Sequence, residues 1–130
     1  MSLFRGDASD FYALAQDLSG VGAKAVPALR VGMGLAGKTI EQAWRNNAAA
    51  TSGAHGKHYP NSIDSELVFD LGGVSVDVGP NASKPQGSMG KGFEFGSVNQ
   101  PPHLDGAKAL AANEAAVEKV VAQALDSLFS

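Results

Sequence analysis

The segment that decides the fold is Phe93-Glu94-Phe95-Gly96-Ser97-Val98-Asn99-Gln100-Pro101-Pro102-His103-Leu104. A short apolar run ends at Gly96, which predicts a strand followed by a turn. Proline has no amide donor, and the residue before it avoids the α conformation, so the next helix can begin only after Pro102. We therefore expect a stiff elbow, residues 93–104, that presents an acidic, an aromatic and an imidazole side chain together. No nucleophile–base pair or metal cluster accompanies them in the sequence, so the elbow indicates an assembly surface.

A long Ala-rich helix is predicted after the elbow, from about residue 105 to residue 129. Its buried face consists of apolar residues at helical spacing, Leu110, Val117, Val121, Ala124 and Leu128. Before the elbow, residues 66–71 and 74–78 alternate apolar and polar side chains on either side of Gly72-Gly73. This pattern predicts an antiparallel hairpin with a two-residue turn.

Two helices are predicted before the hairpin. The first is short, is capped by Asp7 or Ser9, and has an inward face formed by Phe11, Leu14, Leu18 and Val21. The second begins near Pro27, because proline suits a first helical turn, and its buried face is Leu29, Met33, Ala36, Ile40 and Trp44. Gly32, Gly34 and Gly37 within it each cost about 1 kcal/mol relative to alanine. We interpret these glycines as a place where another helix packs closely.

The order helix, helix, hairpin, strand, helix predicts an α+β fold with one domain over residues 1–130. A small antiparallel sheet, made of the hairpin and a further strand at residues 93–95, packs with two N-terminal helices and a long C-terminal helix. Open sheet edges invite pairing with a neighbouring subunit. Residues 1–8 and the polar loops 51–61 and 79–92 bury little apolar surface, so we expect them to be mobile until the protein assembles.

Composition places the chain among globular proteins and excludes several functions. Its 130 residues are 44% hydrophobic and 18% charged, with a net charge of -3 and no cysteine. Disulfide frameworks and thiolate chemistry are therefore excluded. The negative charge disfavours a broad basic face that reads nucleic-acid sequence. The sequence has neither a bilayer-length apolar run nor a signal-peptide core, so we expect it to be made and kept in a cytosol.

One motif points to a different function. Gly32-Met33-Gly34-Leu35-Ala36-Gly37-Lys38-Thr39 matches the phosphate-loop pattern G-x-x-x-x-G-K-[ST], in which glycine amides wrap phosphates, lysine neutralises them and threonine binds magnesium. A helical interpretation is favoured, because the chain is short for a parallel nucleotide-binding sheet, Pro27 would interrupt a central strand and the later hairpin is antiparallel. A small nucleotide-binding protein that uses Gly32–Thr39 is the alternative function.

Other candidate sites have simpler interpretations. His55, His58 and His103 suggest zinc, but the first two fall in a loop and no cysteine joins them, so contacts with backbone or a partner are expected instead. Four carboxylates near the hairpin include a conceivable catalytic pair, but their alternation predicts a solvated face: Asp64, Glu66, Asp70 and Asp77. Asn81-Ala82-Ser83 has the form of a glycosylation site without a secretory route. We expect no cofactor, no metal and no enzymatic activity.

Several short motifs occur in a recognisable order. They are Tyr59-Pro60-Asn61-Ser62-Ile63, the hairpin through Gly72-Gly73, Gly79-Pro80, Lys84-Pro85-Gln86-Gly87, Glu94-Phe95-Gly96-Ser97 and Pro101-Pro102-His103-Leu104. Over about residues 7–128 this arrangement resembles the head–tail joining proteins of long-tailed bacteriophages, also called tail-completion, neck or minor tail proteins. The segments around Gly79-Pro80 and residues 84–87 look like the variant found in phages of actinobacteria.

The resemblance implies a structural virion protein that forms a ring, of six subunits by analogy, in the neck between the capsid connector and the tail tube. Its partners would be copies of itself, neighbouring connector, tail terminator or tail tube proteins, and DNA passing without sequence recognition through the channel; no membrane is involved. It would be located in the host cytoplasm during assembly and then in the virion. The residues expected at subunit contacts, in the elbow or beside the channel are Lys57, Tyr59, Lys84, Lys91, Glu94, Phe95, Gly96, Pro101, Pro102 and His103.

Overall fold

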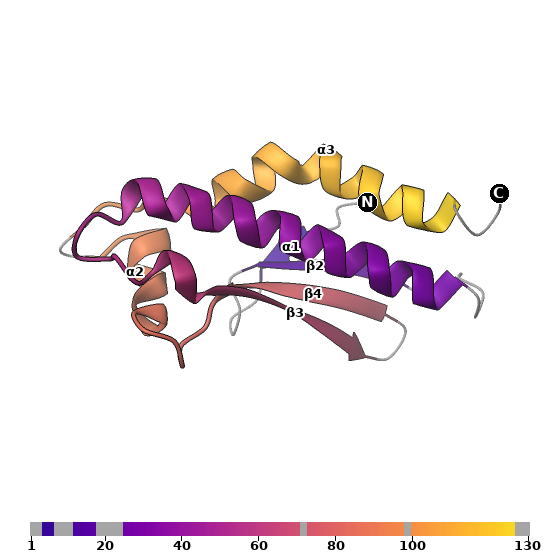
Figure 1. The fold of residues 1–130 in the computed structure, drawn as a ribbon, viewed down its shortest axis with the longest axis horizontal. Helices are drawn as coiled ribbons and strands as arrows, with labels where there is room; N and C mark the ends of the chain where they lie inside the picture. Colours follow the sequence, from indigo (N-terminus) through magenta and orange to yellow (C-terminus); the bar gives the residue numbers. More distant parts are fainter. Residues whose placement is uncertain (1–3, 7–11, 18–24, 71–72, 98–99, 127–130) are drawn as a thin grey trace.

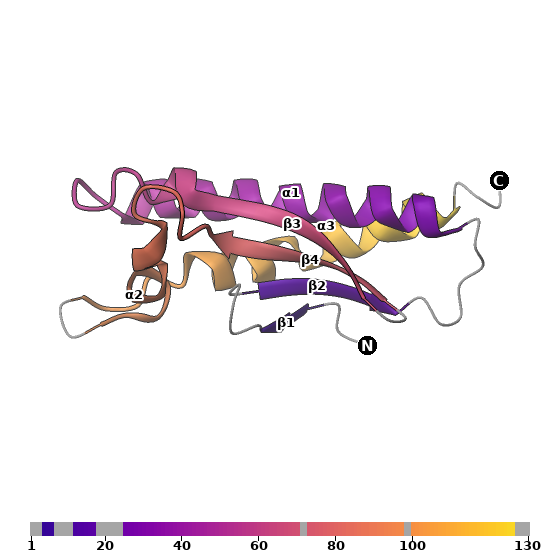
Figure 2. The same cartoon turned by 90° about the horizontal axis from the view of Figure 1, so that it is seen from below.

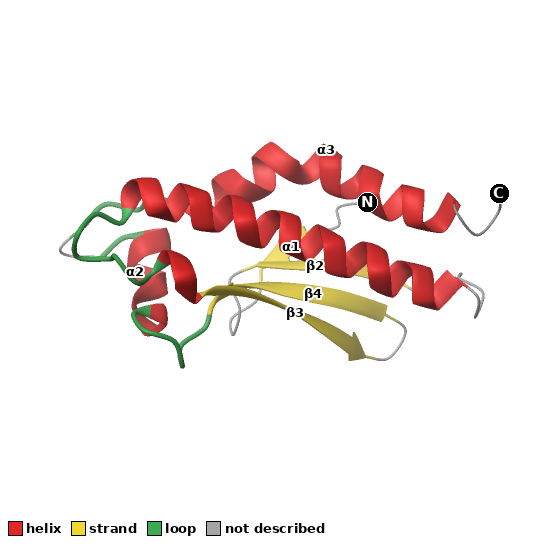
Figure 3. Ribbon diagram, in the orientation of Figure 1, coloured by secondary structure: helices red, strands yellow, loops and turns green. Residues whose placement is uncertain are grey.

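The computed structural model of the chain describes residues 4–6, 12–17, 25–70, 73–97 and 100–126 (Figures 1 and 3). The elements, in chain order, are β1 (Phe4–Gly6), β2 (Tyr12–Asp17), α1 (Ala25–Thr51), the 3₁₀ turn η1 (Pro60–Ser62), β3 (Ile63–Asp70), β4 (Gly73–Pro80), the 3₁₀ turn η2 (Gly87–Met89), α2 (Gly90–Phe95) and α3 (Asp105–Asp126). The predicted α+β class is confirmed.

The strands form one antiparallel sheet in the order β1-β2-β4-β3. The predicted hairpin is β3 and β4, in which Leu67 lies opposite Val76 and Glu66 opposite Asp77. Gly73, predicted as the second turn residue, is instead the first residue of β4 and pairs with Asp70. Residues 71–72 lie outside the described residues. Val74, Val76 and Val78 are buried, as their alternation predicted.

The long helices α1 and α3 lie side by side, run in opposite directions and cover the same face of the sheet (Figures 1 and 2). The predicted apolar face of α1 forms the centre of the core, since its members are fully buried: Leu29, Met33, Ala36, Ile40 and Trp44. Val117 and Val121 of α3 are buried against this core, and Leu110 packs at its border. Among the described helices, none combines the length and apolarity that a membrane span requires.

The predicted first helix is wrong, because Tyr12–Asp17 is strand β2. This strand pairs with β4 along its whole length, from Tyr12 opposite Val78 to Asp17 opposite Gly73. The helical spacing of Phe11, Leu14 and Leu18 misled the prediction. Pairing with an open edge of the hairpin, a tertiary interaction, outweighs the weak preference of a short segment for helix.

The predicted third strand at residues 93–95 is also wrong, because these residues end helix α2. Three residues are too few for periodicity to distinguish a strand from a helix. The chain before them turns tightly: a Cβ atom at Gly87 would lie 1.8 Å from the Asn81 carbonyl oxygen. Gly87, at this close approach, is the first residue of η2, and η2 leads directly into α2.

One glycine of α1, Gly37, has a different role from the one predicted. A Cβ atom at Gly37 would lie 2.5 Å from Val76 Cγ2, so Gly37 lets α1 approach the sheet rather than another helix. Close contact between helices occurs instead at Gly106 of α3, where a Cβ atom would lie 2.7 Å from the Trp44 ring. The pattern identified close packing and assigned it to the wrong partner.

Candidate functional site

The elbow joins α2 to α3 at one end of the molecule (Figure 1). Its turn is narrow: the Ser97 amide donates to the Gln100 carbonyl at 2.9 Å, and the Gln100 amide donates to the Ser97 carbonyl at 3.3 Å. Gly96 has a φ of 85°, and a Cβ atom there would lie 2.9 Å from Pro102 Cδ. Glycine is therefore required at this position both by backbone conformation and by space.

The return arm of the elbow is tied to α2. The His103 amide donates to the Phe93 carbonyl, and the Leu104 amide donates to the Glu94 carbonyl, each at 3.0 Å. Leu104 has a φ of 55°, a left-handed conformation that a branched apolar residue seldom adopts. Helix α3 then begins at Asp105, after both prolines, as predicted. Backbone hydrogen bonds and a glycine contact therefore hold the described residues on both arms of the elbow together.

A buried carboxylate links the elbow to the start of α3. Glu94 is 0% exposed. Its Oε1 accepts a hydrogen bond from the Gly106 amide at 2.9 Å, and its Oε2 accepts from the Ala107 amide at 3.0 Å and from the Tyr12 hydroxyl at 2.7 Å. The two amides belong to the first turn of α3, whose donors have no partner within the helix, and a negative charge there is favoured by the helix dipole. Glu94 thus caps α3 and connects it to β2.

A second buried carboxylate links α3 to α1. Asp105 is 1% exposed, and its Oδ2 accepts a hydrogen bond from the Thr51 hydroxyl at 2.6 Å. The Asp105 carbonyl accepts from the Asn47 side-chain amide at 3.0 Å. His103 Nδ1 lies 4.0 Å from Asp105 Oδ2. Two carboxylates therefore attach the start of α3 to α1, α2 and β2.

Aromatic packing anchors the loop of residues 51–61. Tyr59 is 0% exposed and stacks on Phe93 of α2 with ring centroids 4.5 Å apart. A Cβ atom at Gly56 would lie 2.8 Å from Phe93 Cζ, so only glycine fits. Burial raises the pKa of Tyr59, and the charges of Glu94 and Asp105 add to the rise. Burial also raises the pKa of Tyr12, to which its hydrogen bond with Glu94 adds.

The two polar loops contact each other through Gln86. The His58 amide donates to Gln86 Oε1 at 2.7 Å, and the Gln86 side-chain amide donates to the His55 carbonyl. Both loops therefore have internal structure in the single subunit. Their further ordering on assembly stays a prediction.

Apolar and basic side chains are exposed around the elbow. Phe95 is 52% exposed, Met89 47% and Leu104 40%. The remaining exposed residues at this end include Lys57, Lys91, Pro101 and Pro102. The outer surface of the elbow is therefore apolar and basic, whereas the carboxylates of Glu94 and Asp105 are buried beneath it.

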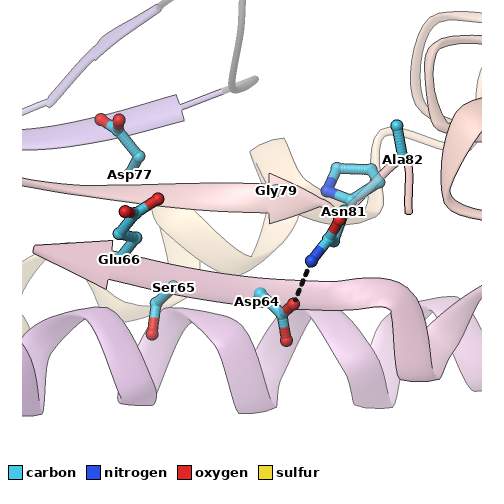
Figure 4. A pocket seen from close by; sticks show the side chains of 8 residues that line it. Asp64, Ser65, Glu66, Asp77, Gly79, Asn81 and Ala82 are labelled. Atoms are coloured by element: carbon cyan, nitrogen blue, oxygen red, sulfur yellow. Dashed lines mark hydrogen bonds between the residues drawn. The ribbon is translucent and has the colours of Figure 1, made fainter. Parts of the chain in front are cut away.

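A hollow of about 240 Å³ lies beside this end, on strands β3 and β4 (Figure 4). We call it the acidic hollow, because three of the residues that line it are carboxylates. The lining residues are Asp64, Ser65, Glu66, Asp77, Gly79, Pro80, Asn81 and Ala82. Asp64 Oδ1 accepts from Lys84 Nζ at 2.7 Å, and Asp64 Oδ2 accepts from Asn81 Nδ2 at 3.0 Å. Burial alone would raise the pKa of Asp64, but hydrogen bonds from Lys84 and Asn81 and the charges of Lys84 and Arg45 outweigh it and lower the pKa.

This lowered pKa makes a prediction about pH. Asp64 adds stability above the pKa that it has in the unfolded chain, and that contribution is lost as the pH falls through the lower pKa of the folded state. The effect is small, because the side chain is 33% exposed and salt screens the pair. In Lys84→Met, NMR titration should show a higher pKa for Asp64, whereas Lys57→Met should leave it unchanged. An unchanged pKa in Lys84→Met would contradict the pairing.

The structure places the predicted site residues in three groups. Tyr59 and Glu94 are fully buried, so neither can contact a neighbouring subunit directly as the subunit stands. Lys84 is paired with Asp64. The others lie at the surface or line the elbow: Lys57, Lys91, Phe95, Gly96, Pro101, Pro102 and His103.

Sequence reasoning missed four residues that build this site: Tyr12, Thr51, Gln86 and Asp105. Asp105 had a detectable signal, since an aspartate directly before an Ala-rich run is typical of a helix start. Tyr12 had none, because its segment was assigned to a helix and its partner lies 82 residues away.

The phosphate-loop motif has no loop conformation here. Gly32–Thr39 lies inside α1, as the helical interpretation predicted, so its amides belong to the helix. Lys38 Nζ lies 3.1 Å from Glu41 Oε1, and the Thr39 hydroxyl donates to the Leu35 carbonyl at 3.0 Å. Asn81 of the sequon accepts hydrogen bonds from the Ser83 amide and hydroxyl, which closes a local turn. Among the described residues no three His, Asp or Glu side chains are grouped to hold a metal ion.

Comparison with known protein families, with curated proteins and with solved structures gave no match for this chain. The site is therefore interpreted from its own geometry.

Proposed function

We propose that the chain is a structural subunit of a phage neck, one of several copies in a ring that joins the DNA-filled head to the tail or completes the tail. The observation that carries the proposal is the elbow: a turn held by glycine contact and backbone hydrogen bonds, capped from inside by Glu94, with apolar and proline side chains outward. A rigid projection with an apolar surface suits permanent contact with another protein.

The chemistry of the buried polar groups supports a structural role. Glu94 receives three hydrogen bonds that cap α3, and Asp105 receives one from Thr51. Carboxylates placed in this way support a helix start rather than face a substrate. Exposed Lys57 and Lys91 suit an acidic protein surface or the DNA backbone in a channel, which requires only weak contacts without sequence recognition.

The test replaces Pro101 and Pro102 with alanine. Both prolines are exposed, so the double variant should fold with a melting temperature within a few degrees of the wild type. Without them the direction of the elbow is less restricted, since proline removes conformational freedom from the chain. We therefore expect complete heads and complete tails that fail to join, counted by electron microscopy of phage particles.

Pro85→Ala is the matched control, because Pro85 is an exposed proline outside the elbow. It should leave joining normal. If particles with both elbow prolines replaced join as often as wild-type particles, the elbow has no role in joining. If electron microscopy of labelled virions finds the chain outside the neck and tail, the proposed function itself is wrong.

A further inference from the structure

Charge is segregated along this chain. The segments 52–62, 81–97 and 100–104 form one end of the molecule, which we call the basic end (Figure 1). They contain Lys57, Lys84 and Lys91, and their one carboxylate, Glu94, is 0% exposed. The rest of the sequence has twelve carboxylates and seven Lys or Arg residues. The exposed charge of the basic end is therefore positive on a chain that is negative overall.

Two of the three lysines are available for a partner. Lys84 is held by Asp64 at 2.7 Å, at the rim of the acidic hollow. Lys57 and Lys91 are exposed, and within the described part of the chain neither forms an ion pair. Within the subunit, Lys84 is thus paired with the acidic hollow, and Lys57 and Lys91 are exposed to a binding partner.

The acidic hollow has the opposite character. Glu66 and Asp77 are directly opposite each other on β3 and β4, and both side chains project away from α1 (Figure 4). Glu66 is exposed, and Asp77 beside it adds a second carboxylate to the same face. The face on which they lie has no helix over it in the described residues (Figure 2). The hollow is a concave, acidic and accessible surface.

We propose that the acidic hollow of one subunit binds the basic end of a second copy, with Lys57 and Lys91 of that copy directed toward Glu66 and Asp77. The two surfaces are different patches on one chain, and if each of them meets a different neighbour the contact is heterologous and generates a ring when the rotation closes. A second copy is favoured over DNA because the carboxylates repel a polyanion, whereas one contact between copies brings a negative and a positive surface together. The inference names the subunit contact of the proposed ring, yet it is testable in solution without a phage.

Charge reversal tests the contact. The first variant is Lys57→Glu/Lys91→Glu, and the second is Glu66→Lys/Asp77→Lys; both leave the Lys84–Asp64 pair in place. In low salt, analytical ultracentrifugation should show association of the wild type that weakens as salt is raised. Each variant alone should associate at least tenfold more weakly. An equimolar mixture should regain association, with the two variants alternating in native mass spectrometry, because each reversed surface then meets its complement.

Glu118→Lys/Lys119→Glu on the exposed side of α3 is the control and should associate as the wild type does. Circular dichroism melting establishes that every variant is folded. The proposal is overturned if the wild type is monomeric at the highest attainable concentration in low salt, if either variant associates normally, or if the mixture stays monomeric. Loss of binding to a double-stranded oligonucleotide in the first variant, with association intact, would assign the lysines to DNA instead. Wild-type neck joining alongside failed association would disprove this contact and leave the proposed function standing.

Discussion

Replacing Glu94 with alanine should lower the free energy of unfolding by about 3–5 kcal/mol, the range for removing one partner from a buried charged network. The change leaves the amides of Gly106 and Ala107 and the hydroxyl of Tyr12 without their acceptor, in a place that water cannot reach easily. It also empties the volume of a fully buried side chain. Urea unfolding followed by circular dichroism measures the loss as a shift in midpoint at constant slope.

Two control variants separate the cap from general effects. Glu94→Gln keeps the volume and one carbonyl acceptor but removes the charge and places an amide donor near amide donors, so its loss should fall between wild type and Glu94→Ala. Glu114→Gln changes an exposed glutamate of α3 and should stay within about 0.5 kcal/mol of wild type. A loss below about 1 kcal/mol for Glu94→Ala would show that the start of α3 is not held from inside the elbow.

The second large effect concerns two glycines of helix α1, Gly34 and Gly37. Replacing them with alanine should change the free energy of unfolding in opposite directions. Gly37→Ala should destabilise the protein by about 1–3 kcal/mol, because the new methyl group would lie 2.5 Å from Val76 Cγ2 and 3.4 Å from Ser65 Cβ. Gly34→Ala should stabilise it by up to about 1 kcal/mol, since alanine favours helix and the nearest atom, Leu67 Cδ1, is 3.8 Å away.

The pair of variants tests how α1 sits on the sheet. Helix propensity alone predicts that both changes stabilise, so the sign for Gly37→Ala isolates the contact with β4. Thermal and urea unfolding of the two proteins, measured together, give that sign. Stabilisation by Gly37→Ala would mean that α1 lies farther from Val76 than the structure places it.

The elbow connects stability to the proposed role. Glu94 and Asp105 are buried, and their hydrogen bonds hold the first turn of α3 against α1, α2 and β2. The exposed side chains of Phe95, Met89 and Leu104 belong to the segments next to these hydrogen bonds. A change in the buried cap should therefore alter the surface as well as the stability, even though the cap itself touches no neighbour.

Much of the fold was predictable from local patterns. The apolar face of α1, the β3–β4 hairpin and the start of α3 beyond Pro102 each rest on a long periodic segment or on the backbone restriction of proline. The α+β class followed from their order. Of the site, the sequence indicated that glycine and proline shape the elbow, because these residues limit the backbone wherever they occur.

Tertiary structure alone decided the rest. Tyr12–Asp17 became a strand because β4 offered an edge. Residues 93–95 end helix α2, in which Phe93 is buried and stacks on Tyr59. Gly37 was read as a helix contact, but its neighbour is a sheet valine 39 residues later. Glu94, expected at the surface, caps a helix from inside. Segments this short carry too little local information to choose a structure, so contacts between residues far apart in the chain determine their conformation, burial and partners.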